Sequence, residues 1–370
     1  METWDPYQAL YLHIPFCKQR CNYCDFETQA IDQDNEAIDT YVDNLIAQVR
    51  SYSNQDLLGN IKTVYLGGGT PSYLGNKRLS SLLYALSISL HLTPEVECTL
   101  EANPDSLSLP MVKDLFALGV TRISLGVQSF DNKLLRVLGR VHNADQARCA
   151  IQCAQERFEN ISIDLMCGLP DQTQESFQQD LEEAIALGVK HVSVYPLTIE
   201  EGTPFDILYR SGQLSYDEDL GAQLMDQASE FLTSQGLVHY EVASYAFPGF
   251  ESQHNSAYWK GIPYLGLGKG AVSMRQNDLC RQRFSSEGII EELDVFQMAA
   301  EDLMLGMRMS KGVSDEDIEI SSLLLPELPS TLQALLHQGY IVHENSRWKP
   351  THKGWLFGNQ LYGELLDLAP

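Results

Sequence analysis

Six short apolar segments separated by helical stretches constrain the fold of this chain more than any other feature. The apolar segments, rich in Val, Ile and Tyr, are Ala9 to Ile14, Ile61 to Leu66, Val96 to Leu100, Val120 to Val127, Ile161 to Met166 and Val189 to Tyr195. Residues with helical character between them form the stretches Asp39 to Arg50, Leu79 to Leu90, Met111 to Leu118, Asp145 to Glu156 and Thr173 to Leu187. This alternation predicts an α/β fold with a parallel sheet, whose ligands bind where the strands end.

The alternation weakens after Gly202, and we predict three domains, at residues 1–202, 203–289 and 290–370. In the middle domain, a helix at Asp217 to Gly236 and a strand at Leu237 to Tyr245 are expected to extend the sheet or cover its mouth. The last domain shows helices and then a hairpin, at Leu293 to Met309, Asp315 to Leu324, Leu332 to Gln338 and Tyr340 to Pro350. That order is typical of a mainly α, winged-helix-like module.

The charge balance limits the partners that this chain can bind. Lys and Arg number 25 against 50 Asp and Glu, a net charge of -25 that repels nucleic acid phosphates and anionic lipids. The N-terminus lacks a signal-peptide pattern, and no apolar run approaches the roughly 20 residues needed to span a bilayer. We therefore expect a cytoplasmic protein with no membrane anchor and no nucleic acid partner.

Three of the eight cysteines lie close together immediately after the first predicted strand, as Cys17, Cys21 and Cys24. Three thiolates so near in sequence are expected to share one metal centre. A four-iron cluster held by three cysteines keeps one iron open for a small chelating ligand. The alternative from spacing alone is a zinc knuckle completed by His13.

A glycine-rich turn follows the second predicted strand, where residues 67–71 read Gly-Gly-Gly-Thr-Pro. Glycines there allow a ligand to approach the backbone, although a tight structural turn would also need them. Together with C-x-x-x-C-x-x-C, this turn resembles the radical SAM (S-adenosylmethionine) superfamily. Nearly the whole chain resembles the branch that contains oxygen-independent coproporphyrinogen dehydrogenases and the HemW haem chaperones. The resemblance implies a partial (β/α)6 radical SAM barrel.

The resemblance also implies roles for individual residues. The three cysteines would hold a 4Fe-4S cluster, and SAM would bind its open iron. The residues that match SAM-site positions of the superfamily are Tyr11, Tyr23, Gly68, Gly69, Thr70, Glu101, Gln128, Arg140, Asp164 and Thr198. Without the resemblance, Glu101 and Asp164 could each be a structural carboxylate whose burial is compensated by a partner.

Two features favour the haem chaperones over the dehydrogenases. Asp25 and Phe26 follow Cys24 where the dehydrogenases continue to a fourth cysteine, and few residues precede Cys17, so we expect no N-terminal active-site extension. The segment from His254 to Trp259 resembles the H-N-x-x-Y-W motif of the chaperones. Its imidazole could ligate haem iron, with aromatic rings against the macrocycle; alternatively, His254 bonds a backbone group and Trp259 fills the core.

We therefore predict a haem chaperone that delivers haem within porphyrin metabolism. Coproporphyrinogen III dehydrogenation, or another radical SAM reaction on a tetrapyrrole, is the alternative, so enzymatic activity stays open. The expected partners are haem, haem-accepting proteins with respiratory membrane proteins as one class, and a reduced electron donor. Gly266 to Gly270 could suggest a phosphate-binding loop, but no βαβ unit follows it.

Overall fold

A twelve-stranded sheet forms the centre of the protein in the computed structural model, which describes residues 4–90 and 95–370. Its strand order is β14-β13-β12-β11-β1-β4-β5-β6-β7-β8-β10-β9. Six adjacent strands are parallel, namely β1 (Ala9–Ile14), β4 (Thr63–Gly68), β5 (Glu97–Ala102), β6 (Arg122–Gln128), β7 (Ile161–Cys167) and β8 (His191–Pro196). The predicted α/β fold with six parallel strands is therefore confirmed.

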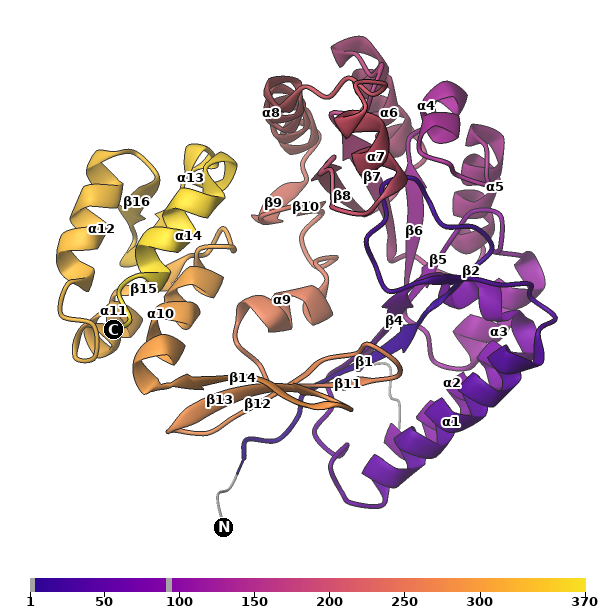
Figure 1. The fold of residues 1–370 in the computed structure, drawn as a ribbon, viewed down its shortest axis with the longest axis horizontal. Helices are drawn as coiled ribbons and strands as arrows, with labels where there is room; N and C mark the ends of the chain where they lie inside the picture. The colour runs from indigo at the N-terminus through magenta and orange to yellow at the C-terminus, as the bar shows by residue number, and fades with distance from the viewer. Residues whose placement is uncertain (1–3, 91–94) are drawn as a thin grey trace.

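Helices pack on the outer side of these strands. They are α1 (Glu36–Ser53), α2 (Asn76–Leu90), α3 (Leu109–Ala117), α5 (Ala144–Gln155), α6 (Gln174–Ala186) and α8 (Glu218–Ser234). In Figure 1, α6 and α8 lie at the top and α5, α3, α2 and α1 follow down the right. Side chains such as Asn143 and Thr173 cap their N-termini in reciprocal capping boxes. The sequence analysis did not predict three short helices, η1 (Pro71–Leu74), α4 (Asn132–Val137) and α7 (Pro204–Arg210).

The sheet is extended at both ends. The predicted strand at Leu237 to Tyr245 is two antiparallel strands, β9 (Val238–Glu241) and β10 (Ser244–Ala246), and β10 pairs with β8. At the other end, β11 (Tyr264–Leu267) pairs in parallel with β1. The antiparallel strands that follow were not predicted, and they are β12 (Ser273–Gln276), β13 (Cys280–Ser285) and β14 (Gly288–Asp294).

The H-N-x-x-Y-W segment forms the short helix α9 (Gln253–Trp259), which lies between the parallel strands and the C-terminal module in Figure 1. Ser252 caps this helix by accepting a hydrogen bond from the backbone N of Asn255. The helix packs against β4 and against the first helix of the C-terminal module.

The C-terminal module has its own apolar core, which includes Leu303, Leu332 and Trp348. Its helices are α10 (Val295–Gly306), α11 (Asp315–Ser322), α12 (Leu328–His337), α13 (His352–Leu356) and α14 (Gly358–Leu366). Its small sheet holds β15 (Val313–Ser314), β16 (Ile341–Glu344) and β17 (Arg347–Pro350), and the order is consistent with the expected winged-helix-like module. The predicted helix from Leu293 begins later, because Asp294 ends β14 and caps α10. The three domain boundaries stay predictions.

Among the described residues, no helix is both long and apolar enough to cross a membrane.

Candidate functional site

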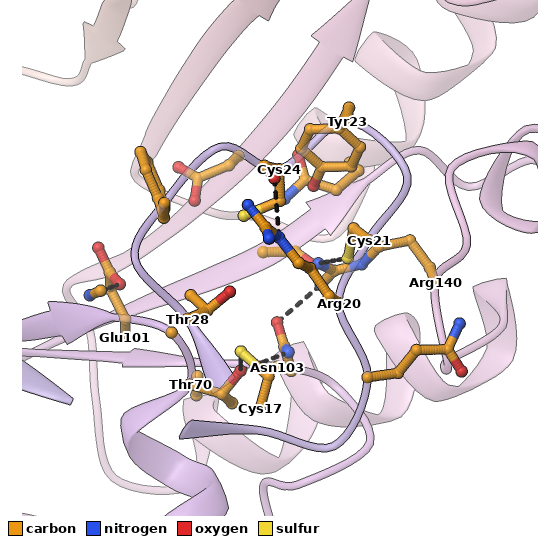
Figure 2. Close-up of a pocket in the computed structure, with 18 of the residues that line it drawn as sticks. Cys17, Arg20, Cys21, Tyr23, Cys24, Thr28, Thr70, Glu101, Asn103 and Arg140 are labelled. Atoms are coloured by element: carbon orange, nitrogen blue, oxygen red, sulfur yellow. Dashed lines mark hydrogen bonds between the residues drawn. The ribbon is translucent and has the colours of Figure 1, made fainter. Parts of the chain in front are cut away.

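The three cysteines lie in one loop at the carboxyl end of β1. Cys17 ends the short strand β2 (Phe16–Cys17), and Cys21 and Cys24 follow before β3 (Gln29–Ala30). The loop is fastened to α4, because Asn22 donates from its side chain to the Val137 carbonyl at 2.8 Å. All three thiols are partly exposed and line a cavity of about 140 Å³, shown in Figure 2. The loop therefore presents the thiols to one shared space.

His13 does not complete a metal site with these thiols. Its Nδ1 lies 3.0 Å from the Tyr11 hydroxyl and its Nε2 lies 3.0 Å from the Glu27 carbonyl oxygen, so both ring nitrogens are engaged. Within residues 4–90 and 95–370, no compact group of three metal-ligating side chains is formed. A four-iron cluster binds each thiolate to a different iron, so it accepts thiols farther apart than one zinc ion does. The geometry therefore fits the cluster better than the zinc knuckle.

Hydrogen-bond donors point at two of the sulfur atoms. Thr70 Oγ1 donates to Cys17 Sγ at 3.4 Å, and Arg140 Nη1 donates to Cys21 Sγ at 3.4 Å. Asn103 connects the two donors, because its Nδ2 donates to Thr70 Oγ1 at 3.0 Å and its Oδ1 accepts from Arg140 Nη2 at 2.7 Å (Figure 2). Burial raises the pKa of the Cys17 thiol to about 11, so this sulfur needs a metal to remain a thiolate.

The glycine-rich turn after β4 approaches this loop too closely for a side chain. Gly68 has a φ of +109°, a conformation that favours glycine. A Cβ on Gly69 would lie 2.9 Å from the carbonyl oxygens of Ile14 and Phe16 and 3.0 Å from Cys17 Sγ. Gly69 is therefore required by the packing of the cluster loop, and Gly68 by its backbone conformation and by the adjacent ring of His13, in addition to any ligand contact.

Two partly exposed carboxyl groups line the same cavity, Glu101 near the end of β5 and Asp164 in the middle of β7. Glu101 accepts hydrogen bonds from the Tyr65 hydroxyl at 2.7 Å and from the backbone N of Gly68 at 3.1 Å. Burial raises the pKa of Glu101 to about 7, and burial also raises the pKa of Asp164 to about 6, opposed by the positive charge of Arg122. Desolvation in the cavity therefore disfavours the charged form of both carboxyl groups, a property common among functional carboxylates.

The cavity brings together most of the predicted site residues. They are Cys17, Cys21, Cys24, Tyr23, Gly68, Gly69, Thr70, Glu101, Gln128, Arg140 and Asp164. Gln128 has a φ of +68° at a bulge in β6, and Arg140 Nη2 donates to the Gly126 carbonyl within that bulge. Such backbone strain is commonly stored at functional sites.

Tyr11 and Thr198 do not line this cavity. Tyr11 packs on the ring of Tyr65, with ring centroids 6.3 Å apart, and Thr198 is exposed after β8. Their roles at a SAM site stay predictions. The sequence analysis did not single out Asn103 or Thr28, which line the cavity. Asn103 lies two residues after Glu101, directly after β5. This position at a strand end is the signal by which it could have been predicted as a site residue.

His254 lies in the interior, outside the cysteine cavity. It is 1% exposed; its Nδ1 lies 2.8 Å from Thr63 Oγ1 and its Nε2 lies 3.1 Å from the Tyr258 hydroxyl. Its ring stacks on Tyr65, the residue that donates to Glu101, with centroids 5.0 Å apart. Burial lowers the pKa of His254 to about 3. Haem ligation by His254 stays a prediction, and it would require one ring nitrogen to lose its present contact and the imidazole to become accessible.

Comparisons with known proteins cover nearly the whole chain. Residues 11–184 match the family model of the radical SAM superfamily, and residues 294–357 match the HemN C-terminal domain. The chain is 35% identical over 373 residues to the curated protein Heme chaperone HemW of Lactococcus lactis subsp. lactis (strain IL1403), covering 97% of each. It is 33% identical over 371 residues to Heme chaperone HemW of Escherichia coli (strain K12), covering 96% of this chain and 97% of the relative.

A solved structure shares the architecture over almost the full length. Coproporphyrinogen III oxidase (HemN) from Escherichia coli, described as a radical SAM enzyme, matches with a TM-score of 0.80. The match covers 97% of this chain and 90% of that enzyme at 21% sequence identity, which shows a common fold.

Proposed function

This chain belongs to the HemW family of the radical SAM superfamily, and from this premise we propose that it is a haem chaperone. It binds haem and delivers it to proteins that require haem, on a scaffold that carries a 4Fe-4S cluster and SAM. The observation that supports the scaffold is the convergence of three thiols, the glycine-rich turn and two carboxyl groups with raised pKa values on one cavity.

Each residue of the cavity has a role in this proposal. Cys17, Cys21 and Cys24 hold the cluster, which supplies one-electron reduction to SAM when both are bound. Glu101 accepts hydrogen bonds from ribose hydroxyls, since its carboxylate already lies among donors. Arg140 fixes Cys21 through its sulfur and holds the bulge of β6 through the Gly126 carbonyl.

Phe26 favours the chaperone over coproporphyrinogen III dehydrogenation. It lines the cavity at the position of the dehydrogenases' fourth cysteine and is 60% exposed, so an apolar ring replaces a thiol beside the cluster loop. A phenyl ring can neither transfer a proton nor ligate iron. We therefore expect no conversion of coproporphyrinogen III.

The test uses the full chain, reconstituted anaerobically with iron, sulfide and SAM. We expect about four irons per chain, a Soret band on addition of haem, and transfer of that haem to an apo-haemoprotein. The triple variant Cys17→Ala, Cys21→Ala, Cys24→Ala should bind no iron. Stoichiometric zinc without iron uptake would refute the cluster, and failure to bind haem would refute the chaperone. Repeated turnover of coproporphyrinogen III would establish the dehydrogenase instead.

The remaining partners are also part of this proposal. We propose a cytoplasmic chaperone that receives electrons from a reduced donor protein and gives haem to respiratory membrane proteins among its acceptors. Its excess of acidic side chains favours basic surfaces on these partners. Haem transfer that weakens with rising salt concentration would support such contacts, and salt-independent transfer would oppose them.

A further inference from the structure

A second and larger cavity lies on the opposite face of α9 from the buried imidazole. It has a volume of about 570 Å³, within the roughly 300–1,000 Å³ typical of small-molecule sites. Its walls come from the residue before β1, the start of β4, β9, the loop before α9, one face of α9, and the turn after α10. It shares no lining residue with the cysteine cavity.

Helix α9 has two faces with different surroundings. His254 and Tyr258, four residues apart, face β4 and bond to each other. Gln253, Ala257 and Lys260 follow the helical spacing of the other face and line the large cavity. The H-N-x-x-Y-W helix therefore forms a wall of this cavity through residues outside its characteristic letters.

Three lysines from separate segments surround the cavity: Lys62 before β4, Lys260 at the end of α9 and Lys311 after α10. None of them forms an ion pair with another residue of the described ranges. One acidic residue, Glu251, also lines the cavity, and its carboxylate accepts a hydrogen bond from the backbone N of Gly249. Three of the 25 basic residues in a chain of net charge -25 thus gather at one concave site, which favours an anion.

The rest of the lining favours a ligand that is not purely ionic. Val238, Ala257, Ile262 and Met309 supply apolar surface between the lysines. A small phosphate would leave this surface uncovered. A flat apolar molecule with carboxylates at its edge would cover it and also meet the cations.

We propose that this cavity binds a dicarboxylate tetrapyrrole, with its macrocycle against the apolar wall and its propionates at Lys62, Lys260 and Lys311. The inference rests on the proposed haem-chaperone function and gives haem a location. Each exposed pair of this kind contributes modestly, so all three lysines are needed for a large effect on affinity.

The test uses a triple variant that combines Lys62→Gln, Lys260→Gln and Lys311→Gln, called the cavity variant. Haem titration compares it with the wild-type chain after reconstitution. We expect the triple variant to bind haem about tenfold more weakly. The matched control changes Lys77, Lys113 and Lys133 to Gln, which removes the same charge from exposed helix positions outside the cavity. Thermal unfolding of all three proteins verifies that the variants are folded.

Haem dimethyl ester is the second probe, since its propionates carry no charge. The cavity variant should bind this ester as tightly as the wild type does, because the ester has no carboxylates with which the lysines could pair. Equal haem affinity in the wild type and the cavity variant would overturn this location while leaving the chaperone intact. Inorganic phosphate that binds through the three lysines without displacing haem would also overturn it. A wild-type chain that binds no haem would instead refute the proposed function.

Discussion

Replacing Glu101 by Gln should make the cluster-free protein more stable at pH 8 while weakening its binding of SAM. Burial raises the pKa of Glu101 from its ordinary value of 4.5 to about 7. The folded chain therefore keeps a proton that the unfolded chain releases above about pH 4.5, and stability falls as pH rises between these values. The full rise in the pKa of Glu101 corresponds to a loss of about 3 kcal/mol in the free energy of unfolding at pH 8.

Gln removes this penalty without losing the local contacts. Its carbonyl oxygen can accept from the backbone N of Gly68, and its amide can donate to the Tyr65 hydroxyl, which now lies 2.7 Å from the carboxylate. We expect Glu101→Gln to raise the free energy of unfolding by about 2–3 kcal/mol at pH 8. The increase should be about 2 kcal/mol smaller at pH 5.5, because the wild-type carboxyl is largely protonated there. SAM affinity should fall at least tenfold, since the proposed contact with the ribose loses its charged acceptor.

Urea unfolding followed by circular dichroism at pH 5.5 and pH 8 measures the difference. Glu230→Gln, at an exposed position of α8, is the matched control and should shift neither transition. A stability gain equal at both pH values would show that the buried charge is not its cause. A variant less stable than the wild type at pH 8 would refute the reasoning.

Two further substitutions test the surroundings of the site. Gly69→Ala should lower iron occupancy after reconstitution with unchanged far-UV circular dichroism, because its Cβ would lie 2.9 Å from two carbonyl oxygens. The control is Gly59→Ala, whose Cβ would have no atom within 4 Å. Equal iron occupancy in the two variants would contradict this prediction. His254→Ala should lower the free energy of unfolding by about 2–4 kcal/mol, because buried partners such as Thr63 Oγ1 lose their hydrogen bonds. An altered Soret spectrum with unchanged stability would instead support haem ligation by His254.

The central strands could be predicted from the sequence because strands buried on both faces are continuous apolar runs. The strand β13 was missed for the opposite reason. It reads Cys-Arg-Gln-Arg-Phe-Ser, yet Arg281 is 1% exposed, with its guanidinium on Glu301 at 2.5 Å and on Asp302 at 2.7 Å. A buried ion pair cannot be recognised when its partners lie on a later helix.

The cysteine loop was predictable and the surroundings of His254 were not, because the first is local and the second depends on distant residues. Cys17, Cys21 and Cys24 lie within eight residues of one another, so the sequence alone places them close together. The imidazole of His254 contacts Thr63, and its backbone N donates to Glu97, residues far away in sequence. A motif fixes which side chains are present, but the fold decides whether they face a ligand or the interior.

The position of β1 in the sheet sets an order of events during synthesis. One edge of β1 pairs with β4 as soon as that strand exists, while the other edge awaits β11, with Ala9 opposite Tyr264. The turn after β11 then reaches the base of the cysteine loop, where Lys269 forms an ion pair with Glu27 at 2.9 Å. A growing chain thus holds a complete set of cluster-binding cysteines while this side of the strand is still uncovered. Such pairing over a long sequence separation is slow and leaves an open edge exposed. The loop that would receive the iron is therefore enclosed on this side only by a strand that lies about 240 residues later in the chain.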